Sequence, residues 1–269
     1  KLCNSGIMVF DGGSLFRFLD KVGKNNSKGE YYLTDVIAFA RANGKKCVVL
    51  EAPAEELHGI NSRSDLGRAE WIMQRRLQSR AFSSGVTLQD PSTTRMCVDT
   101  RIGQDVTVEP NVFFGPGVVI GDKVLIRAFS HLEGVQIDSG AVIGPFARLR
   151  PGAVIGEGAR VGNFVEIKSA SIEAGAKINH LAYIGDSRVG KGANVGAGTI
   201  TCNYDGFRKH KTQIGDRVQI GSDTTLIAPI TINDDVYIAT ATTVRHDVPA
   251  GALVFNRRQE VTRETHRYH

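Results

Sequence analysis

The chain has 269 residues, a length that suits one large or two ordinary domains, and its 41% hydrophobic and 23% charged residues are typical of a globular protein. No apolar run approaches the roughly 20 residues that span a bilayer, and no signal-peptide pattern is present, so we expect no membrane insertion. The net charge of +5 favours anionic partners such as phosphorylated metabolites or a nucleotide. The basic residues are scattered and lack interleaved aromatics, which argues against nucleic acid.

The four cysteines lie far apart in the sequence and show no metal-ligand spacing. This usage predicts reduced thiols and a cytoplasmic location. The chain also begins at Lys1 in sequence typical of the middle of an element, so we expect it to be a fragment of a longer protein.

Residues 1–61 mix strand-like and helical patterns. Helix signals cover 14–22 and 35–43, and the apolar runs 6–10 and 45–53 suggest strands, the second one buried. Alternating strands and helices predict an α/β layer, but these elements are too few to complete one. We therefore expect 1–61 to be the C-terminal remnant of an α/β domain.

Residues 62–85 contain the pattern of one longer helix. A serine at 62 or 64 offers the N-cap, an apolar stripe follows, and Gly85 is a plausible stop. We interpret this segment as a linker helix, although an ordinary packed surface helix is compatible with the same pattern.

From about residue 100, an aliphatic residue recurs at every sixth position, with three steps of five residues and one interruption after Val195. The repeated positions include Ile102, Val108, Phe114, Ile120, Ile126, Leu132, Ile137, Ile143, Leu149, Ile155, Val161, Ile167, Ile172, Ile178, Ile184, Val189, Val195, Ile214, Ile220, Leu226, Ile232, Ile238 and Val244. This period is typical of a hexapeptide parallel β-helix, in which three hexads close one triangular coil. Each coil is stabilised by stacking on its neighbours. We therefore assign residues 86–257 to a β-helix domain.

Two segments depart from this repeat. Residues 201–213 have no aliphatic residue at the expected position, so a loop leaves the wall there; such loops are natural sites of function, although a tolerated insertion is the alternative. Residues 258–269 are polar and are expected to form a solvated tail.

Several polar residues on the predicted wall suggest chemistry. Arg150 and Lys168 are eighteen residues apart, one full coil, so they would stack on one face. Stacked cations repel each other unless an anion joins them, which suggests a phosphate clamp; two solvated surface cations are the alternative. His180 lies on an adjacent coil, and histidine is the usual side chain that takes a proton at neutral pH. A structural role is the alternative for this lone histidine.

At these residues the sequence resembles a known family. The segments that carry the resemblance are IGPFARLRPGA, VGNFVEIK, INHLAYIGD, NVGAGTITCNYDG and IGSDTTLIAP. They resemble the acetyltransferase half of the bacterial bifunctional glucosamine-1-phosphate N-acetyltransferase and N-acetylglucosamine-1-phosphate uridylyltransferase. The resemblance implies a mainly β fold, a left-handed parallel β-helix of hexapeptide repeats, preceded by an incomplete α/β piece and a connecting helix.

The resemblance also implies roles for individual residues. His180 falls on the family's general base, which would take a proton from the amine of glucosamine 1-phosphate as that amine attacks acetyl-CoA. Glu166 is a candidate partner of this histidine. The positions that would bind the sugar phosphate are Arg150, Lys168, Tyr183 and Asn194. The positions that would contact acetyl-CoA are Ala197, Asn203, Tyr204, Ser222, Thr240 and Arg257. Thr240 stands where relatives carry alanine, which puts that contact in question.

Upstream, Asn4 and Asn61 match positions that bind the uridylated sugar and, for Asn61, Mg²⁺. The chain lacks the family's glycine-rich nucleotide-binding start, so we expect no uridylyl transfer from it. The family's active site lies between subunits of a homotrimer, which implies the same assembly here. A hexapeptide acyltransferase with another sugar or amine acceptor, and a non-catalytic trimeric scaffold, are the alternatives.

Overall fold

The computed structural model describes residues 3–257. The chain divides into two compact units, with the boundary between Met73 and Gln74. No helix in the described part of the chain is long and apolar enough to cross a membrane. Each unit is described by itself below.

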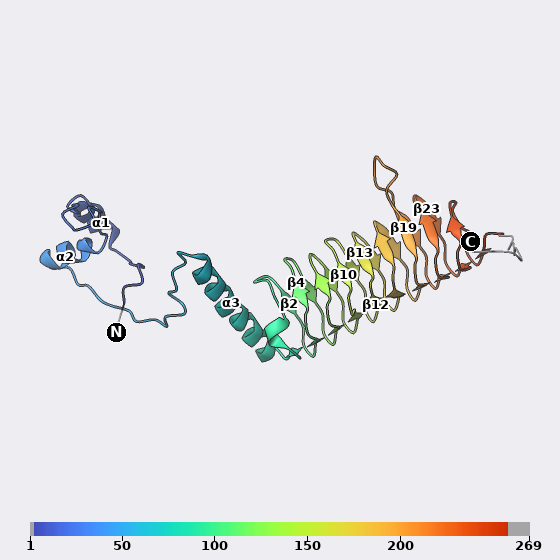
Figure 1. The fold of residues 1–269 in the computed structure, drawn as a ribbon, viewed down its shortest axis with the longest axis horizontal. Helices are drawn as coiled ribbons and strands as arrows, with labels where there is room; N and C mark the ends of the chain where they lie inside the picture. The colour runs from blue at the N-terminus through green and yellow to red at the C-terminus, as the bar shows by residue number, and fades with distance from the viewer. Residues whose placement is uncertain (1–2, 258–269) are drawn as a thin grey trace, which may run out of the picture. The chain divides into compact units, whose positions relative to one another are not determined.

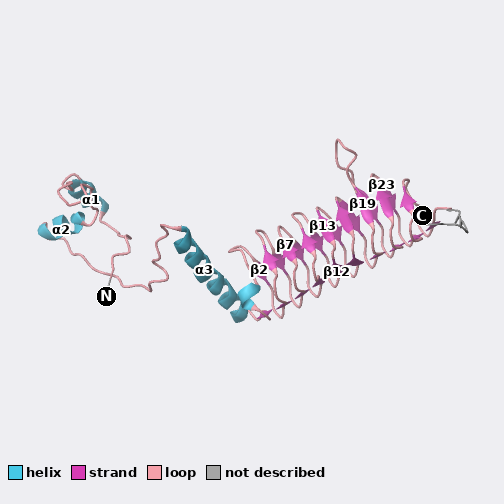
Figure 2. Cartoon of the chain, viewed as in Figure 1, coloured by secondary structure: helices cyan, strands magenta, loops and turns pink. Residues whose placement is uncertain are grey.

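The N-terminal unit contains helices and no strand among residues 3–61 (Figures 1 and 2). The two predicted helices are confirmed as α1 (Gly12–Leu19) and α2 (Asp35–Ala42). Helix α1 begins earlier than expected because Asp11, not Ser14, is its N-cap and accepts a hydrogen bond from the Gly13 N–H. A carboxylate at this position satisfies one of the unpaired amides of the first turn.

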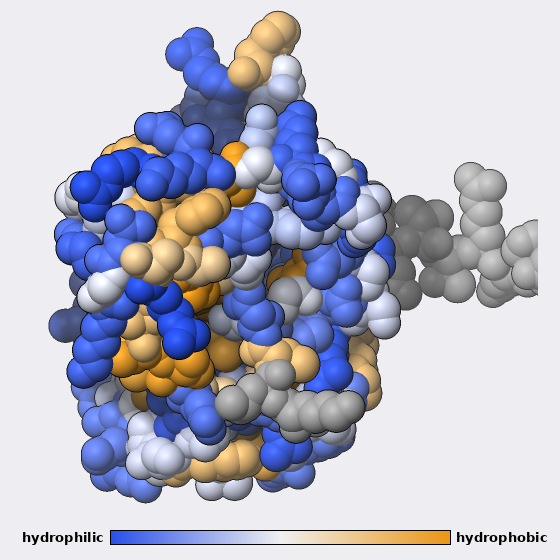
Figure 3. Space-filling view, turned by 90° about the vertical axis from the view of Figure 1, so that its left-hand side faces the viewer, coloured by the Kyte–Doolittle hydropathy of each residue, from blue (hydrophilic) through white to orange (hydrophobic). Residues whose placement is uncertain are grey.

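The buried strand predicted for 45–53 is wrong. Val48, Val49 and Leu50 are 70%, 81% and 90% exposed, and no strand forms there. A strand needs a neighbour to pair its backbone groups, and residues 3–61 supply none. Figure 3 shows that one face of the molecule has apolar residues, in orange, at its surface between hydrophilic ones.

The helix predicted over 62–84 is confirmed as α3 (Arg63–Ser83). Its second half is fixed to the start of the β-helix through Gln74, which is buried. The Gln74 amide donates to the Met96 carbonyl at 2.8 Å and accepts from the Met96 N–H at 3.0 Å. A short 3₁₀ helix, η1 (Pro91–Thr93), precedes the regular coils.

The C-terminal unit is a parallel β-helix with three sheets, which we call A, B and C. Sheet A contains β1 (Thr87–Leu88), β3 (Thr107–Val108), β6 (Leu125–Ile126), β9 (Val142–Ile143), β12 (Arg160–Asn163), β15 (Lys177–His180), β18 (Asn194–Val195), β21 (Gln219–Ile220), β24 (Tyr237–Ile238) and β26 (Leu253–Val254). Sheet B contains β4 (Phe113–Phe114), β7 (His131–Leu132), β10 (Arg148–Leu149), β13 (Glu166–Lys168), β16 (Tyr183–Gly185), β19 (Ile200–Cys202), β22 (Thr225–Ile227) and β25 (Thr243–Val244). Sheet C contains β2 (Arg101–Ile102), β5 (Val119–Ile120), β8 (Gln136–Ile137), β11 (Val154–Ile155), β14 (Ser171–Ile172), β17 (Ser187–Val189), β20 (Thr212–Ile214) and β23 (Ile230–Ile232). From β2 to β25, consecutive strands enter the three sheets in turn, so each full coil contributes one strand to each sheet.

The residues of the six-residue repeat form the core, as predicted. All of them are buried except Ile102, which is half-buried at the first coil. Equivalent residues stack in register from coil to coil, for example Leu149 on Ile167 and Ile167 on Ile184. One methyl-rich side chain per strand therefore meets its counterparts above and below, and their burial stabilises the solenoid.

The interruption of the repeat has a specific cause. Thr201 occupies the inward position where an aliphatic residue is expected, in register with Leu226. It is buried, and its hydroxyl accepts a hydrogen bond from the Gly185 N–H at 2.8 Å. Residues 203–211 then leave the wall as the protruding loop between β19 and β20 (Figure 1).

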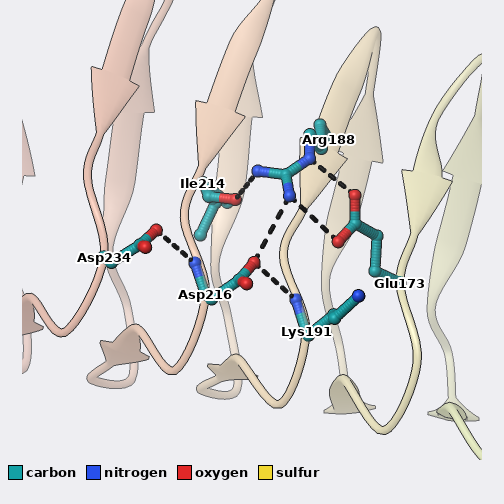
Figure 4. A network of polar contacts seen from close by, with 6 residues as sticks. All are labelled: Glu173, Arg188, Lys191, Ile214, Asp216 and Asp234. Atoms are coloured by element: carbon teal, nitrogen blue, oxygen red, sulfur yellow. Dashed lines mark hydrogen bonds and ion pairs between the residues drawn. The ribbon is translucent and has the colours of Figure 1, made fainter.

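A polar network joins successive coils at the outer side of sheet C (Figure 4). Arg188 donates to both carboxylate oxygens of Glu173, at 2.6 and 2.9 Å, and to Asp216 at 3.3 Å. Asp216 also accepts from the Lys191 N–H, and Asp234 accepts from the Asp216 N–H. The Glu173 carboxylate, as the main cause, and Asp216 raise the pKa of Arg188.

Candidate active site

The predicted base and three predicted acetyl-CoA residues lie in one column, which we call the corner column. It runs along the corner between sheets A and B, where each coil leaves sheet A. The buried residues of β15, β18, β21 and β24 are in register with one another. Each member of the column lies two residues after one of them, so the members align on successive coils. The members are His180, Ala197, Ser222 and Thr240. Parallel strands lie about 4.8 Å apart, so the column offers a straight track along several coils.

His180 stands at the end of β15 with an exposed side chain. Its Nδ1 lies 2.7 Å from Oδ1 of Asn163, the last residue of β12 and its register partner on the preceding coil. Glu166, the partner suggested by the sequence, is not paired with the histidine. Its carboxylate accepts from Arg150 Nη1 at 2.7 Å, and it is in register with Tyr183.

The two predicted clamp cations stack on the outer side of sheet B. The register of β10 and β13 pairs Leu149 with Ile167, so Arg150 and Lys168 lie side by side on adjacent coils. Arg150 is held by Glu166, whereas the pKa of Lys168 is lowered, first by the nearby Lys209 side chain and then by desolvation. The charge of Arg150 lowers this pKa further. Lys168 and Lys209 therefore lie near each other beside the Arg150–Glu166 pair, and Asp186 offsets part of their repulsion. An anion bound there would offset the rest.

Tyr183 crosses the outer side of sheet B toward this cation group. A Cβ added to Gly185 would lie 2.5 Å from the Tyr183 hydroxyl and 2.8 Å from the Asn203 amide nitrogen. Gly185 is the register neighbour of Lys168. The absence of a side chain at Gly185 thus lets the phenol lie flat and brings its hydroxyl near Asn203.

The loop of residues 203–211 is a closed hairpin. Tyr204 forms an antiparallel bridge with Lys209, and the His210 N–H donates to the Asn203 carbonyl at 2.8 Å. Asp205 accepts from the N–H groups of residues 207 and 208 and lies 2.6 Å from His210 Nε2. Hydrogen bonds from the Arg208 amide, from His210 and from the Phe207 amide lower the pKa of Asp205.

Other predicted residues lie elsewhere. Asn194 is on the outer side of sheet A, in register with Lys177, and so faces away from the cations of sheet B. Arg257 is exposed beyond β26. Asn4 and Asn61 belong to the N-terminal unit, where both are exposed. In one copy of the chain, the corner column precedes the sheet B strands, Lys168 lies at the last residue of its sheet B strand, and Asn194 is apart on sheet A.

Sequence reasoning missed three residues of this site. Asn163 precedes His180 by one short coil, so the spacing of the repeat could have predicted that the two residues are neighbours. Lys209 lies in the basic run of the loop that breaks the repeat, which was visible but not connected to Lys168. The role of Gly185 depends on the path of the Tyr183 side chain and had no signal in the sequence.

Comparisons with known proteins show which proteins the chain is similar to. Residues 99–134 match the bacterial transferase hexapeptide family (six repeats), and residues 131–248 match the GMPPB C-terminal domain. The bifunctional protein GlmU of Paramagnetospirillum magneticum is 54% identical over 256 residues, 95% of this chain and 57% of its own. GlmU of Azorhizobium caulinodans is 52% identical over 262 residues, 97% of this chain and 58% of its own. The chain is a relative of the bifunctional GlmU proteins.

The chain spans little more than half the length of these GlmU proteins. The hexapeptide match and the three parallel sheets confirm the predicted parallel β-helix of hexapeptide repeats. Among solved structures, LpxA from Acinetobacter baumannii is similar with a TM-score of 0.41 and 17% identity, over 60% of this chain and 69% of its own.

Proposed function

We propose that the chain transfers the acetyl group of acetyl-CoA to the amine of α-D-glucosamine 1-phosphate, forming N-acetylglucosamine 1-phosphate for UDP-N-acetylglucosamine synthesis. The observation that carries the proposal is the corner column, which aligns His180 with the predicted acetyl-CoA residues. The similarity to GlmU proteins over 95% of the chain supports the same activity.

The column and the cation group suit the two substrates. Ala197, Ser222 and Thr240 stack above His180, so an extended thioester that follows the track places its acetyl end at the imidazole. Arg150, Lys168 and Lys209 form the place for the sugar phosphate. The hydroxyl of Thr240 adds a polar group to the track without closing it, because its side chain is exposed.

In the proposed reaction the sugar amine attacks the thioester carbonyl directly. His180 takes a proton from the amine, and the CoA thiolate leaves as the tetrahedral intermediate collapses. A backbone N–H stabilises the oxyanion. The Asn203 amide is less suited, because it is buried and donates to Asp186. The corner column has two hydroxyls, on Ser222 and Thr240, and among residues 3–257 neither is hydrogen-bonded to a base that would activate it. The transfer therefore proceeds by direct attack in a ternary complex.

We further propose a homotrimer in which the active site lies between subunits. Asn194 on sheet A and the cations on sheet B lie on different sides of one solenoid. A neighbouring copy that presents its sheet A to this sheet B would complete the sugar site. The exposed hairpin 203–211, with Tyr204 at its base, offers a second contribution to such a site.

The N-terminal unit is proposed to be the remnant of a uridylyltransferase domain, with Asn4 and Asn61 at its nucleotide-sugar positions. Asn61 alone does not make a Mg²⁺ site, since this cation takes several oxygen ligands. No group of three or more His, Cys, Asp or Glu side chains suited to a metal occurs within residues 3–257. We therefore derive no metal-dependent step for this chain, and propose a cytoplasmic enzyme of acetyl transfer.

The test is incubation of the purified chain with acetyl-CoA and glucosamine 1-phosphate, with the product identified by its mass. We expect N-acetylglucosamine 1-phosphate and one equivalent of free CoA thiol. Glucosamine 6-phosphate and glucosamine serve as competing acceptors. No acetylated product, or faster acetylation of another acceptor, would overturn the proposed substrate. A non-catalytic scaffold predicts no saturable acetyl-CoA binding by calorimetry.

A further inference from the structure

His180 and Asn163 form a pair that the rest of the solenoid does not repeat. Most strands have two residues, but β12 and β15 each have four and extend their pairing to the corner, where Asn163 is in register with His180. Asn163 is half-buried beneath the exposed imidazole. The extension therefore places one amide directly under the proposed base.

Gly162 allows this close approach. A Cβ at Gly162 would lie 2.0 Å from the backbone oxygen of Asn179, so a larger residue there would force the two coils apart. Beyond the pair, Phe164 and Leu181 turn the corner with φ of 55° and 48°. The backbone on both coils is thus fixed on each side of the Asn163–His180 contact.

The contact determines which ring nitrogen carries the proton. The Asn163 oxygen is an acceptor only, so the hydrogen bond of 2.7 Å requires the proton on His180 Nδ1. Nε2 then carries the lone pair. Among residues 3–257, Nε2 of His180 has no hydrogen-bond partner, which leaves it available to a substrate amine.

We propose that Asn163 is a positioning residue that holds His180 in its Nδ1–H form, so that Nε2 is the atom that accepts the proton. The inference rests on the proposed role of His180 as general base. In a histidine, the hydrogen bond made by one ring nitrogen commonly fixes the tautomer and so leaves the other nitrogen free to accept a proton. A neutral amide does this without adding a negative charge beside the imidazole. The carboxylate suggested as its partner in the sequence, Glu166, is held by Arg150.

The first readout is independent of activity. Nitrogen-15 NMR of the His180 ring in the whole chain, above its titration, should show a protonated Nδ1 and an unprotonated Nε2. In Asn163→Ala the ring should shift toward the Nε2–H form, which a free histidine side chain favours. In Asn163→Asp the Nδ1–H form should persist. An Nε2–H ring in the unmodified chain, or no change in Asn163→Ala, would overturn the proposal.

The second readout is kinetic. Asn163→Ala should lower kcat by about tenfold to a hundredfold, as loss of a partner that orients a histidine commonly does, and leave both KM values within about twofold. Asn163→Asp should restore most of kcat. Its carboxylate stabilises imidazolium and raises the pKa of His180, so activity should fail at a higher pH on acidification. Equal loss of kcat in both variants would contradict a positioning role.

Asn233→Ala is the matched control. Its amide also joins two parts of the solenoid, by donating to the Val248 carbonyl at 2.8 Å, but lies away from the corner column. It should change neither the His180 tautomer nor kcat. If the unmodified chain makes no acetylated product, the proposed function fails while the NMR result still decides the tautomer. If acetylation occurs but the NMR prediction fails, only the role of Asn163 is lost.

Discussion

At the scale of single residues, the chemistry depends on side chains that the repeat does not require. The core uses one aliphatic residue per strand, so an outward cation, amide or imidazole is free to vary without disturbing it. The spacing of eighteen residues was enough to predict that Arg150 and Lys168 stack, and their register confirms this. Spacing alone did not reveal Lys209, because the loop that carries it returns to the wall only in three dimensions.

Lys209 provides a prediction for the sugar phosphate. Replacing it by methionine in Lys209→Met removes one of the positive charges at the proposed phosphate site, so KM for glucosamine 1-phosphate should rise about tenfold, a cost near 1.4 kcal/mol. kcat and KM for acetyl-CoA should stay within about twofold in steady-state assays. Lys211→Met, two residues along the same loop, is the control and should leave all constants unchanged. An unchanged KM in Lys209→Met would remove Lys209 from the clamp.

At the scale of elements, the periodicity of the sequence predicted the coils well because each hexad obeys the same local rule. Every repeat residue from Val108 to Val244 is buried as expected. The strand predicted at 45–53 does not form, because a strand needs a neighbouring strand to pair with. A single apolar run in the sequence does not show whether such a neighbour is present. Thr201 shows the same limit, since a polar residue takes the inward position by bonding to the neighbouring coil.

The hairpin 203–211 should be held by Asp205. The pKa of Asp205 is lowered in the folded chain. Its hydrogen bonds therefore stabilise the hairpin fully above the unfolded pKa of about 3.9, and this stabilisation is lost as the pH falls through the lower folded pKa. Asp205→Ala should therefore speed amide hydrogen exchange within 206–210 at neutral pH, without changing exchange in the β-helix core. Asp223→Ala, outside the hairpin, is a suitable control. Unchanged exchange in Asp205→Ala would contradict this account of the loop.

The network around Arg188 should stabilise the stacking of coils. Arg188→Met removes the bonds to Glu173 and Asp216, and because the arginine is 39% exposed we expect a loss of only about 1 kcal/mol after solvent screening. The comparison is Arg217→Met, whose pair with Asp235 is more exposed. Thermal unfolding should show a lower Tm for Arg188→Met than for Arg217→Met. The reverse order would argue against the network.

At the scale of the whole molecule, the proposed sugar site is incomplete in one copy, because Asn194 and the sheet B cations lie on different sheets. Sedimentation should therefore show a trimer. Co-expression of Asn194→Ala subunits with Lys168→Met subunits should restore part of the activity that each variant alone has lost, since mixed trimers contain some sites with both native groups. A monomer, or no restoration in mixed assemblies, would contradict a site shared between copies.

The most direct measurement of the central claim is the rate of acetyl transfer to glucosamine 1-phosphate by the unmodified chain and by His180→Ala. Loss of a general base costs about a hundredfold or more, so His180→Ala should lose at least that factor in kcat while still binding acetyl-CoA. His131→Ala is the control, because this exposed histidine packs against Phe113 outside the corner column and should keep the full rate. Wild-type turnover in His180→Ala would contradict the account.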